Sequence, residues 1–201
     1  MDRLEWHRYR MAGIGSSDAP VLHGMSKYRK YHELMIEKVS QVIKDSPSNY
    51  IQALGNELEP KMRGFFSLDW MLNTGMSDPF EPKLLIHPKK DYLRASMDGL
   101  SQDGLTFIEC KLVGAKILAS GVVPIAYYMQ MQHQYLVSNA ESGYCVMCDM
   151  KGRGMRIIPV SRDDSFIDVH KRSCKDFWAG VLAGRSELLT PNQLANPIGL
   201  G

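Results

Sequence analysis

The chain has 201 residues, of which 44% are hydrophobic and 23% are charged, and its net charge is +2. This length and balance predict one soluble globular domain with a substantial core. The near-neutral charge excludes a globally basic protein, so any nucleic-acid contact must be a local patch. No apolar run approaches the ~20 residues that span a bilayer, and the N-terminus is too polar for a signal peptide. We therefore expect a cytoplasmic protein.

The first helices surround a serine-rich segment. Residues 2–10 favour a short helix, and Ser16, Ser17 and Asp18 are candidate caps for a second helix that ends near Gly24. A helix start directs free N–H groups at an anion, and Arg10 lies just upstream. The segment is either a phosphate pocket or an ordinary capped helix beside a surface arginine. The residues by themselves favour the ordinary helix.

Basic and aromatic residues alternate in the next segment. They are Lys27, Tyr28, Arg29 and Lys30. Such a segment either grips phosphates and stacks on bases or forms a solvated loop. A helix over residues 31–40 and a polar loop over residues 44–49 follow.

Residues 50–73 carry apolar side chains at three- and four-residue steps, which predicts a helix. Pro60 would kink this helix or mark its start. Glu57 and Glu59 lie beside the apolar stripe. They are either simply exposed or extend an acidic site on the strands that follow.

Three strands are expected over residues 83–87, 92–98 and 105–112. Between the last two lies Asp103-Gly104, the strongest short hairpin signal. If these two residues form the turn, Asp98 lies opposite Glu109 and Ser96 lies opposite Lys111. Directly opposed residues share a face, with Cβ atoms ~5 Å apart.

Two opposed carboxylates repel each other, but a divalent cation such as Mg²⁺ turns them into a site, because it prefers carboxylate oxygens. Glu109 and Lys111 project from one face of their strand, and the Cys110 side chain points to the other face, towards a core. The Cys110 carbonyl could still be a ligand. The alternative is a solvated surface hairpin, because an Asp followed by Glu-x-Lys occurs by chance in many chains.

The last part of the chain alternates helices and strands. Pro124 opens a helix to Ser138, on which Gln130 and Gln134 either hold a water or a phosphate or are surface residues. The other expected elements are a helix or loop at 113–120, strands at 143–149 and 155–160, and an amphipathic helix at 163–182. We expect one domain over residues 1–185 and a tail over residues 186–201.

The four cysteines are expected to be free thiols in a reducing compartment. Cys145-x-x-Cys148 has no second pair and no histidines at finger spacing, so a zinc site is not favoured.

Five short motifs occur in a fixed order. They are Trp6-His7-x-x-Arg10 leading to Ile14-x-x-Ser17, Gly55-x-x-x-Glu59, Ala95-Ser96-x-Asp98-Gly99-Leu100, Glu109-Cys110-Lys111, and Met129-Gln130-x-Gln132. Together they resemble the PD-(D/E)XK nuclease superfamily and, more narrowly, the phage recombination exonucleases typified by lambda exonuclease. The resemblance covers most of residues 6–160. It implies an α/β (α+β) fold of the restriction-endonuclease-like kind, with a central mixed β-sheet flanked by helices.

The resemblance also implies a metal site. One or two Mg²⁺ ions, replaceable by Mn²⁺, would be held by Asp98, Glu109 and the backbone carbonyl of Cys110. Lys111 would orient or activate the attacking water.

Further roles are implied around this centre. Glu59 and Gln130 would assist the metal site and the water, although the family helix usually lacks a proline at the position of Pro60. Arg10, Ser17 and Ser96 would hold a terminal 5′-phosphate.

The implied activity is Mg²⁺-dependent 5′→3′ degradation of one strand of linear duplex DNA from 5′-phosphorylated ends, which leaves 3′ single strands. The resemblance further implies a ring-shaped homotrimer, a single-strand annealing protein as partner, and a phage or prophage origin in a bacterial cytoplasm. The alternatives are a metal-dependent endonuclease on the same fold and a non-catalytic DNA-binding or assembly protein.

Overall fold

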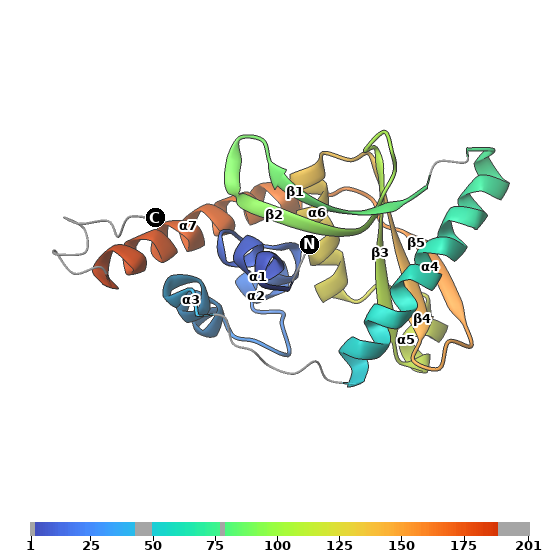
Figure 1. Ribbon diagram of the computed structural model, residues 1–201, viewed down its shortest axis with the longest axis horizontal. Helices are drawn as coiled ribbons and strands as arrows, with labels where there is room; N and C mark the ends of the chain where they lie inside the picture. The colour runs from blue at the N-terminus through green and yellow to red at the C-terminus, as the bar shows by residue number, and fades with distance from the viewer. Residues whose placement is uncertain (1–2, 43–49, 77–78, 189–201) are drawn as a thin grey trace.

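The computed structural model describes residues 3–42, 50–76 and 79–188 (Figure 1). Its strands are β1 (Glu81–His87), β2 (Lys90–Leu100), β3 (Thr106–Val113), β4 (Ser142–Asp149) and β5 (Met155–Pro159). Its helices are α1 (Arg3–Met11), the short 3-10 helix η1 (Ser16–Asp18), α2 (Ala19–Leu22), α3 (Tyr31–Ser40), α4 (Tyr50–Thr74), α5 (Ala115–Ser120), α6 (Ile125–Ser138) and α7 (Asp164–Leu188). The predicted elements are therefore confirmed in kind and order, whereas the polar loop expected at residues 44–49 lies outside the described residues.

The strands form one mixed sheet in the order β1-β2-β3-β4-β5. Strands β3 and β4 are parallel, and the other neighbouring pairs are antiparallel. Parallel neighbours need a long crossover, and α5 and α6 supply it between β3 and β4. The expected mixed sheet flanked by helices is confirmed.

The sheet forks between β2 and β3. Strand β2 pairs with β1, and β3 pairs with β4, along most of their lengths, but β2 and β3 pair only at Gly99 with Ile108 and at Leu100 with Phe107. Beyond that point β1 and β2 curve away from the other strands (Figure 1). The freed edge of β2 instead bridges to Ile14. The divergence opens a space between β2 and β3, here called the fork, and the facing side chains of the two strands lie in it.

The turn at the base of this fork differs from the prediction. The Gly104 N–H donates to the Ser101 carbonyl at 3.0 Å, so the central residues of the turn are Gln102 and Asp103. The prediction of a two-residue turn at Asp103-Gly104 is therefore wrong. That turn type needs a positive φ at both residues, and of the two only Gly104 has one, at +76°. The register is nevertheless the expected one, because the pairing of Gly99 with Ile108 places Asp98 level with Glu109 across the fork.

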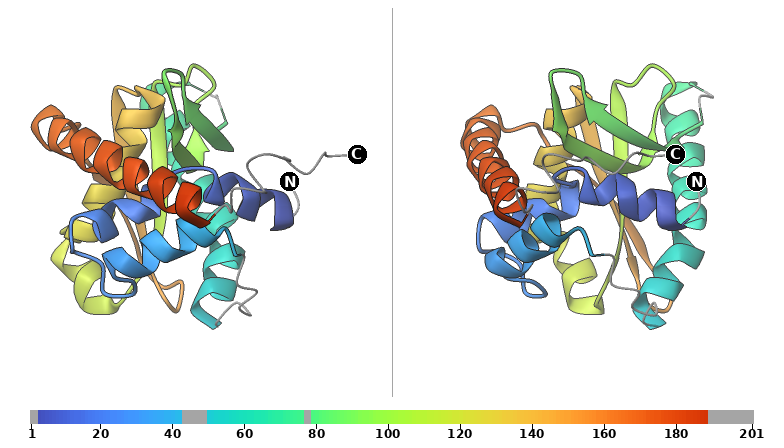
Figure 2. Two further views of the ribbon diagram at one scale, coloured as in Figure 1. Left: turned by 90° about the vertical axis from the view of Figure 1, so that its left-hand side faces the viewer. Right: turned by 60° about the vertical axis from the view of Figure 1, so that its left-hand side comes forward.

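Helices cover both faces of the sheet (Figure 2). Helix α4 covers one face over an apolar cluster that includes Phe66 and Ile108, and the Cys110 side chain packs there, as expected. Helices α2, α6 and α7 cover the other face over the larger cluster. Among the described residues, none of the helices combines the length and the apolar character needed to cross a membrane.

Two helices run further than expected. Helix α4 continues through Pro60 without a break in the helix. Helix α7, expected to end at Leu182, continues to Leu188, so the first residues of the predicted tail are helical. Arg185 fixes this end of α7, because its guanidinium donates to the carbonyls of Lys38 and Met11.

A chain of hydrogen-bonded histidines joins three segments in the larger core. His23 Nε2 lies 3.0 Å from His170 Nδ1, His170 Nε2 lies 2.8 Å from His133 Nδ1, and His133 Nε2 lies 3.0 Å from the Arg94 carbonyl. The carbonyl can only accept, so His133 donates to it through Nε2, and in a chain of neutral rings each ring then donates through Nε2. Cys174 Sγ lies 3.8 and 3.4 Å from the two nitrogens of His170, beside the ring. Because both nitrogens of His133 and His170 already have partners, we interpret the group as a hydrogen-bonded core chain and not as a metal site.

The histidine chain predicts that stability falls in mild acid. Burial lowers the pKa of His133 to about 4 and that of His170 to about 2. Below pH 6.5, the histidine pKa in the unfolded chain, the unfolded chain binds protons at these two histidines and the folded chain does not. The free energy of unfolding should therefore fall by up to about 2.7 kcal/mol for each pH unit lowered between pH 6 and pH 4. Urea unfolding at several pH values measures this slope.

The control is a His133→Asn and His170→Asn double variant, in which the slope should be much smaller. Both proteins should carry Asp98→Asn, because the raised pKa of Asp98 gives a pH dependence of opposite sign. Equal slopes in the two proteins would contradict the neutral chain.

Candidate active site

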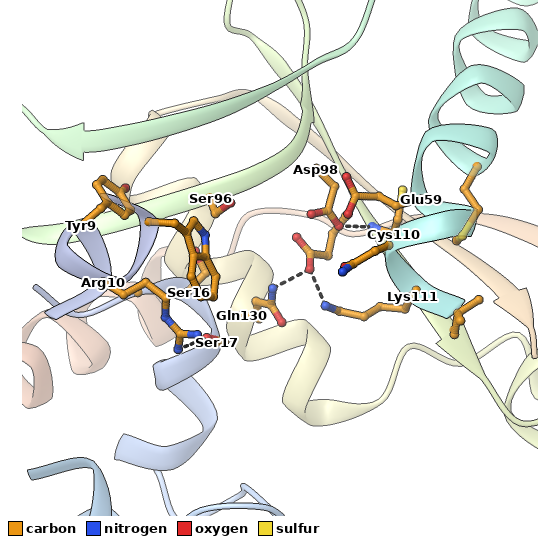
Figure 3. Close-up of a pocket in the computed structure, with 17 residues that line it drawn as sticks. Tyr9, Arg10, Ser16, Ser17, Glu59, Ser96, Asp98, Cys110, Lys111 and Gln130 are labelled. Carbon is orange, nitrogen blue, oxygen red and sulfur yellow. Dashed lines mark hydrogen bonds and ion pairs between the residues drawn. The ribbon is translucent and has the colours of Figure 1, made fainter. Parts of the chain in front are cut away.

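A cavity of about 300 Å³ lies at the fork. It is lined from β2, β3, α1, η1, α4 and α6, and it brings together these residues named from the sequence: Arg10, Ser17, Glu59, Ser96, Asp98, Glu109, Cys110, Lys111 and Gln130. Figure 3 shows Arg10 and Ser17 at one end, and Asp98, Glu59 and Lys111 at the other. The structure thus collects these nine residues in one pocket, while their individual roles stay predictions.

The acidic end is built around Asp98. Its Oδ2 accepts a hydrogen bond from the Cys110 backbone N–H at 2.8 Å, across the fork. Arg63 Nη1 donates to the Asp98 carbonyl at 2.7 Å and to Glu59 Oε1 at 3.0 Å. Glu59 therefore faces the site from α4, and Pro60 does not displace it, because the helix runs on through that residue.

Negative charge is in excess at this end. Burial, and then the charges of Glu109 and Glu59, raise the pKa of Asp98 well above its usual value, although Lys111 opposes the rise. Burial opposes ionisation of Lys111, but Glu109 and Asp98 raise its pKa above the usual value. A cation bound beside Asp98 would favour the ionised form of this carboxylate. The donor set of two carboxylates and a nearby third fits a hard divalent ion such as Mg²⁺.

The carboxylate of Glu109 is buried and held from three sides. Its Oε1 accepts from Lys111 Nζ and from Gln130 Nε2, each at 2.5 Å, and its Oε2 accepts from Gln134 Nε2. A carboxylate offers about four lone-pair positions, so one position remains for a metal ion. The sequence left two alternatives for Gln134, a contact to a water or a phosphate and a surface position, and its burial against Glu109 rules out the surface position. Its only sequence signal was the spacing of four residues from Gln130.

The opposite end carries hydroxyl and guanidinium donors. Arg10 Nη2 donates to Ser17 Oγ at 3.3 Å, and the Arg10 guanidinium lies 4.9 Å from the centre of the Trp6 ring. Ser96 reaches this end from β2. Its predicted pairing opposite Lys111 is wrong, because β2 has left β3 at this point and Ser96 pairs with Leu84 of β1.

Beneath Arg10 lies the fully buried carboxylate of Asp18. It contacts Arg29 at 2.6 Å, Lys38 at 3.1 Å and Arg10 at 3.7 Å, and it accepts the Gly15 N–H at 3.0 Å. Burial raises the pKa of Asp18, but Lys38, Arg10 and Arg29 together lower it to about 2. From the sequence, Asp18 was expected only as a helix cap, because nothing in the sequence connects it to Lys38.

The basic segment is only partly free to contact DNA. Lys27, Tyr28 and Lys30 are exposed, and Tyr28 is 97% exposed. The Arg29 guanidinium is instead held by Asp18 and Glu37, so a DNA contact by Arg29 is not supported. A second cavity of about 690 Å³ shares Arg10 and Ser17 with the first and reaches Tyr28.

The fold of the chain is similar to that of solved exonuclease structures. The chain superposes on the alkaline exonuclease LHK-Exo from Laribacter hongkongensis with a TM-score of 0.77, at 23% identity, over 98% of this chain and 100% of that one. A structure of LHK-Exo in complex with dAMP gives a TM-score of 0.77, at 25% identity, over 92% and 95%. A phage-related exonuclease from Haemophilus somnus 129PT gives a TM-score of 0.66, at 14% identity, over 88% and 96%.

The sequence places the chain in a family. Residues 5–141 match the YqaJ-like viral recombinase domain, and the chain belongs to this family. It is also 26% identical to the uncharacterized protein YqaJ of Bacillus subtilis (strain 168), over 97% of this chain and 61% of that protein. The chain thus spans less than two thirds of the length of that relative. The viral-recombinase resemblance inferred from the motifs is confirmed.

Proposed function

We propose that this protein is a Mg²⁺-dependent exonuclease that degrades one strand of linear duplex DNA in the 5′→3′ direction from phosphorylated ends. The observation that carries the proposal is the single cavity with the Asp98 and Glu109 carboxylates at one end and the Arg10 and Ser17 donors at the other. One end suits a dication and the scissile phosphate, and the other suits a terminal phosphate. Membership in a viral recombinase family and the exonuclease fold both support it.

The residues divide the chemistry between them. Asp98, Glu109 and the Cys110 carbonyl would hold one or two Mg²⁺ ions, which acidify a bound water and neutralise phosphate charge. Lys111 keeps its proton, because its pKa is raised, so it supplies positive charge beside the reacting phosphate and orients the water. Glu59 adds a carboxylate at the edge of the site, and Gln130 orients Glu109.

The phosphate-binding end of the cavity would fix the position of the DNA strand relative to the metal site. Arg10 offers a fixed guanidinium fork, which suits a terminal phosphate, and the hydroxyls of Ser17 and Ser96 lie in the same cavity. When a terminal phosphate is bound there, the next part of the same DNA strand would extend towards the acidic end of the cavity. The complex of LHK-Exo with dAMP supports a nucleotide-sized site in this fold.

The biological setting belongs to the proposal as well. The 3′ single strands left by the reaction would serve recombination by strand annealing, with a single-strand annealing protein as partner. A homotrimeric ring around the DNA would keep the enzyme on its substrate. The protein would act in a bacterial cytoplasm and would be of phage or prophage origin. Light scattering of the purified protein would measure the number of subunits.

Digestion of matched DNA substrates tests the proposed activity. Linear duplex with 5′-phosphates should release nucleotides in Mg²⁺ or Mn²⁺ and leave 3′ single strands. Ends with a 5′-hydroxyl should react at least ~10-fold more slowly because a charge-assisted contact is lost, and closed circles should stay intact. Cutting of the circle would favour an endonuclease. Binding of duplex without any release of nucleotides would favour a non-catalytic DNA-binding protein.

The Arg10→Gln variant is the control for the phosphate end. It should lose most of the preference for phosphorylated ends, because the amide lacks the positive charge. Equal losses of digestion rate on phosphorylated and hydroxyl ends would contradict the phosphate pocket and would leave the proposed metal site unaffected.

A further inference from the structure

Gln134 occupies an unusual position in the site. Its side chain is fully buried on α6, and its Nε2 donates both to Glu109 Oε2 and, at 3.2 Å, to the Ser96 carbonyl. Glu109 belongs to the acidic end, and Ser96 belongs to the phosphate end. One amide nitrogen therefore connects the two strands of the fork at the place where they no longer pair with each other.

The orientation of this amide is fixed by its neighbours. Both groups that face Nε2 are pure acceptors, so a flipped amide would direct its oxygen at a carboxylate and a carbonyl. In the observed orientation Gln134 Oε1 is buried without a hydrogen-bond partner. An unpaired buried oxygen lowers stability, so stability alone does not explain a glutamine here.

The adjacent buried glutamine shows the contrast. Gln132 is equally buried, but its Nε2 donates to the Ser161 carbonyl and its Oε1 accepts from the Asp163 N–H, each at 2.8 Å. Both polar ends are satisfied, and neither partner lines the cavity. Gln132 thus anchors the start of α7, whereas Gln134 contacts residues that line the cavity.

We propose that Gln134 is a positioning residue that orients the Glu109 carboxylate for the metal ion and sets its distance from the phosphate-binding strand. This inference rests on the proposed function. A donor on Oε2, together with the donors on Oε1, leaves a single lone-pair direction of Glu109 open. Such outer hydrogen bonds typically change metal affinity 10- to 100-fold.

The experiment compares Gln134→Met with Gln132→Met, because methionine keeps the volume and removes the amide in both. Calorimetric titration of the DNA-free protein with Mn²⁺ should show binding weakened by about 10- to 100-fold for Gln134→Met. Gln132→Met should bind Mn²⁺ within about threefold of wild type, because the Gln132 amide contacts the Ser161 carbonyl and the Asp163 N–H, which lie outside the cavity.

The possible outcomes separate this inference from the proposed function. Equal Mn²⁺ affinity of Gln134→Met and wild type would overturn the positioning role and leave the nuclease proposal standing. A wild-type protein that binds no Mn²⁺ and digests no DNA would reject the proposed function itself. If Gln134→Met does not fold, Gln134→Asn is measured in the same way. Failure of both to fold, while Gln132→Met folds, would assign Gln134 a structural role and overturn the inference.

Discussion

Replacing Lys111 by methionine should lower the rate of Mg²⁺-dependent nucleotide release at least ~100-fold, because a positive charge aimed at the developing phosphate charge is lost. Lys111 is half-buried, lies 2.5 Å from Glu109, and has a raised pKa. Duplex binding should change by less than about tenfold, because one of several cationic contacts is removed. Release from end-labelled linear duplex and a filter-binding assay measure the two quantities.

Lys116→Met is the matched control, because Lys116 is an exposed lysine on α5, outside the cavity. It should retain activity close to wild type. A Lys111→Met protein that keeps more than about a tenth of the wild-type rate would show that the lysine is dispensable for the chemistry.

The Asp18→Asn variant should lose about 3–5 kcal/mol of its free energy of unfolding, because it leaves the buried ammonium of Lys38 without a counter-charge. Asp18 and Lys38 are both fully buried and lie 3.1 Å apart. For a chain of this size the melting temperature should fall by roughly 6–20 °C. Urea unfolding and calorimetry measure the two changes.

The pH dependence gives a second check on the same carboxylate. The folded pKa of Asp18 is about 2, below the unfolded value of 3.8. Its contribution is therefore fully present above pH 3.8 and is lost as the pH falls through 2, so the difference in free energy of unfolding between wild type and variant should narrow over this range. The exposed pair of Glu57 and Lys61 is the control, because Glu57→Gln should cost less than about 1 kcal/mol. Similar losses in the two variants would contradict the buried network.

The sequence anticipated most of the fold because the periodicity of its apolar residues is local. Helix α4 follows from apolar side chains at three- and four-residue steps, and β3 follows from the alternation of Glu109 and Lys111 with Ile108 and Cys110. The register of the hairpin was also right, although the turn type was wrong. Local backbone preference does not distinguish a turn at Asp103-Gly104 from one a residue earlier when the Asp103 carboxylate can accept the Leu105 N–H.

The site was anticipated in its residues but not in its geometry. The motifs named Asp98, Glu109 and Lys111, and the hairpin count placed the first two level with each other. The position of Ser96 was wrong because the count assumed that β2 and β3 stay paired, whereas they diverge after two pairs. Divergence depends on what packs at the freed edge, here the bridge from Ile14, which no local pattern reports.

By itself the sequence determined which side chains carry charge and which face of each element is apolar, since both depend on residues only a few positions apart. Tertiary structure alone decided that Gln134 meets Glu109, 25 residues away, and that Lys38 lies buried beside Asp18. The physical reason is that a buried polar group takes whichever partner the packing of distant segments supplies, and its stability depends on that partner.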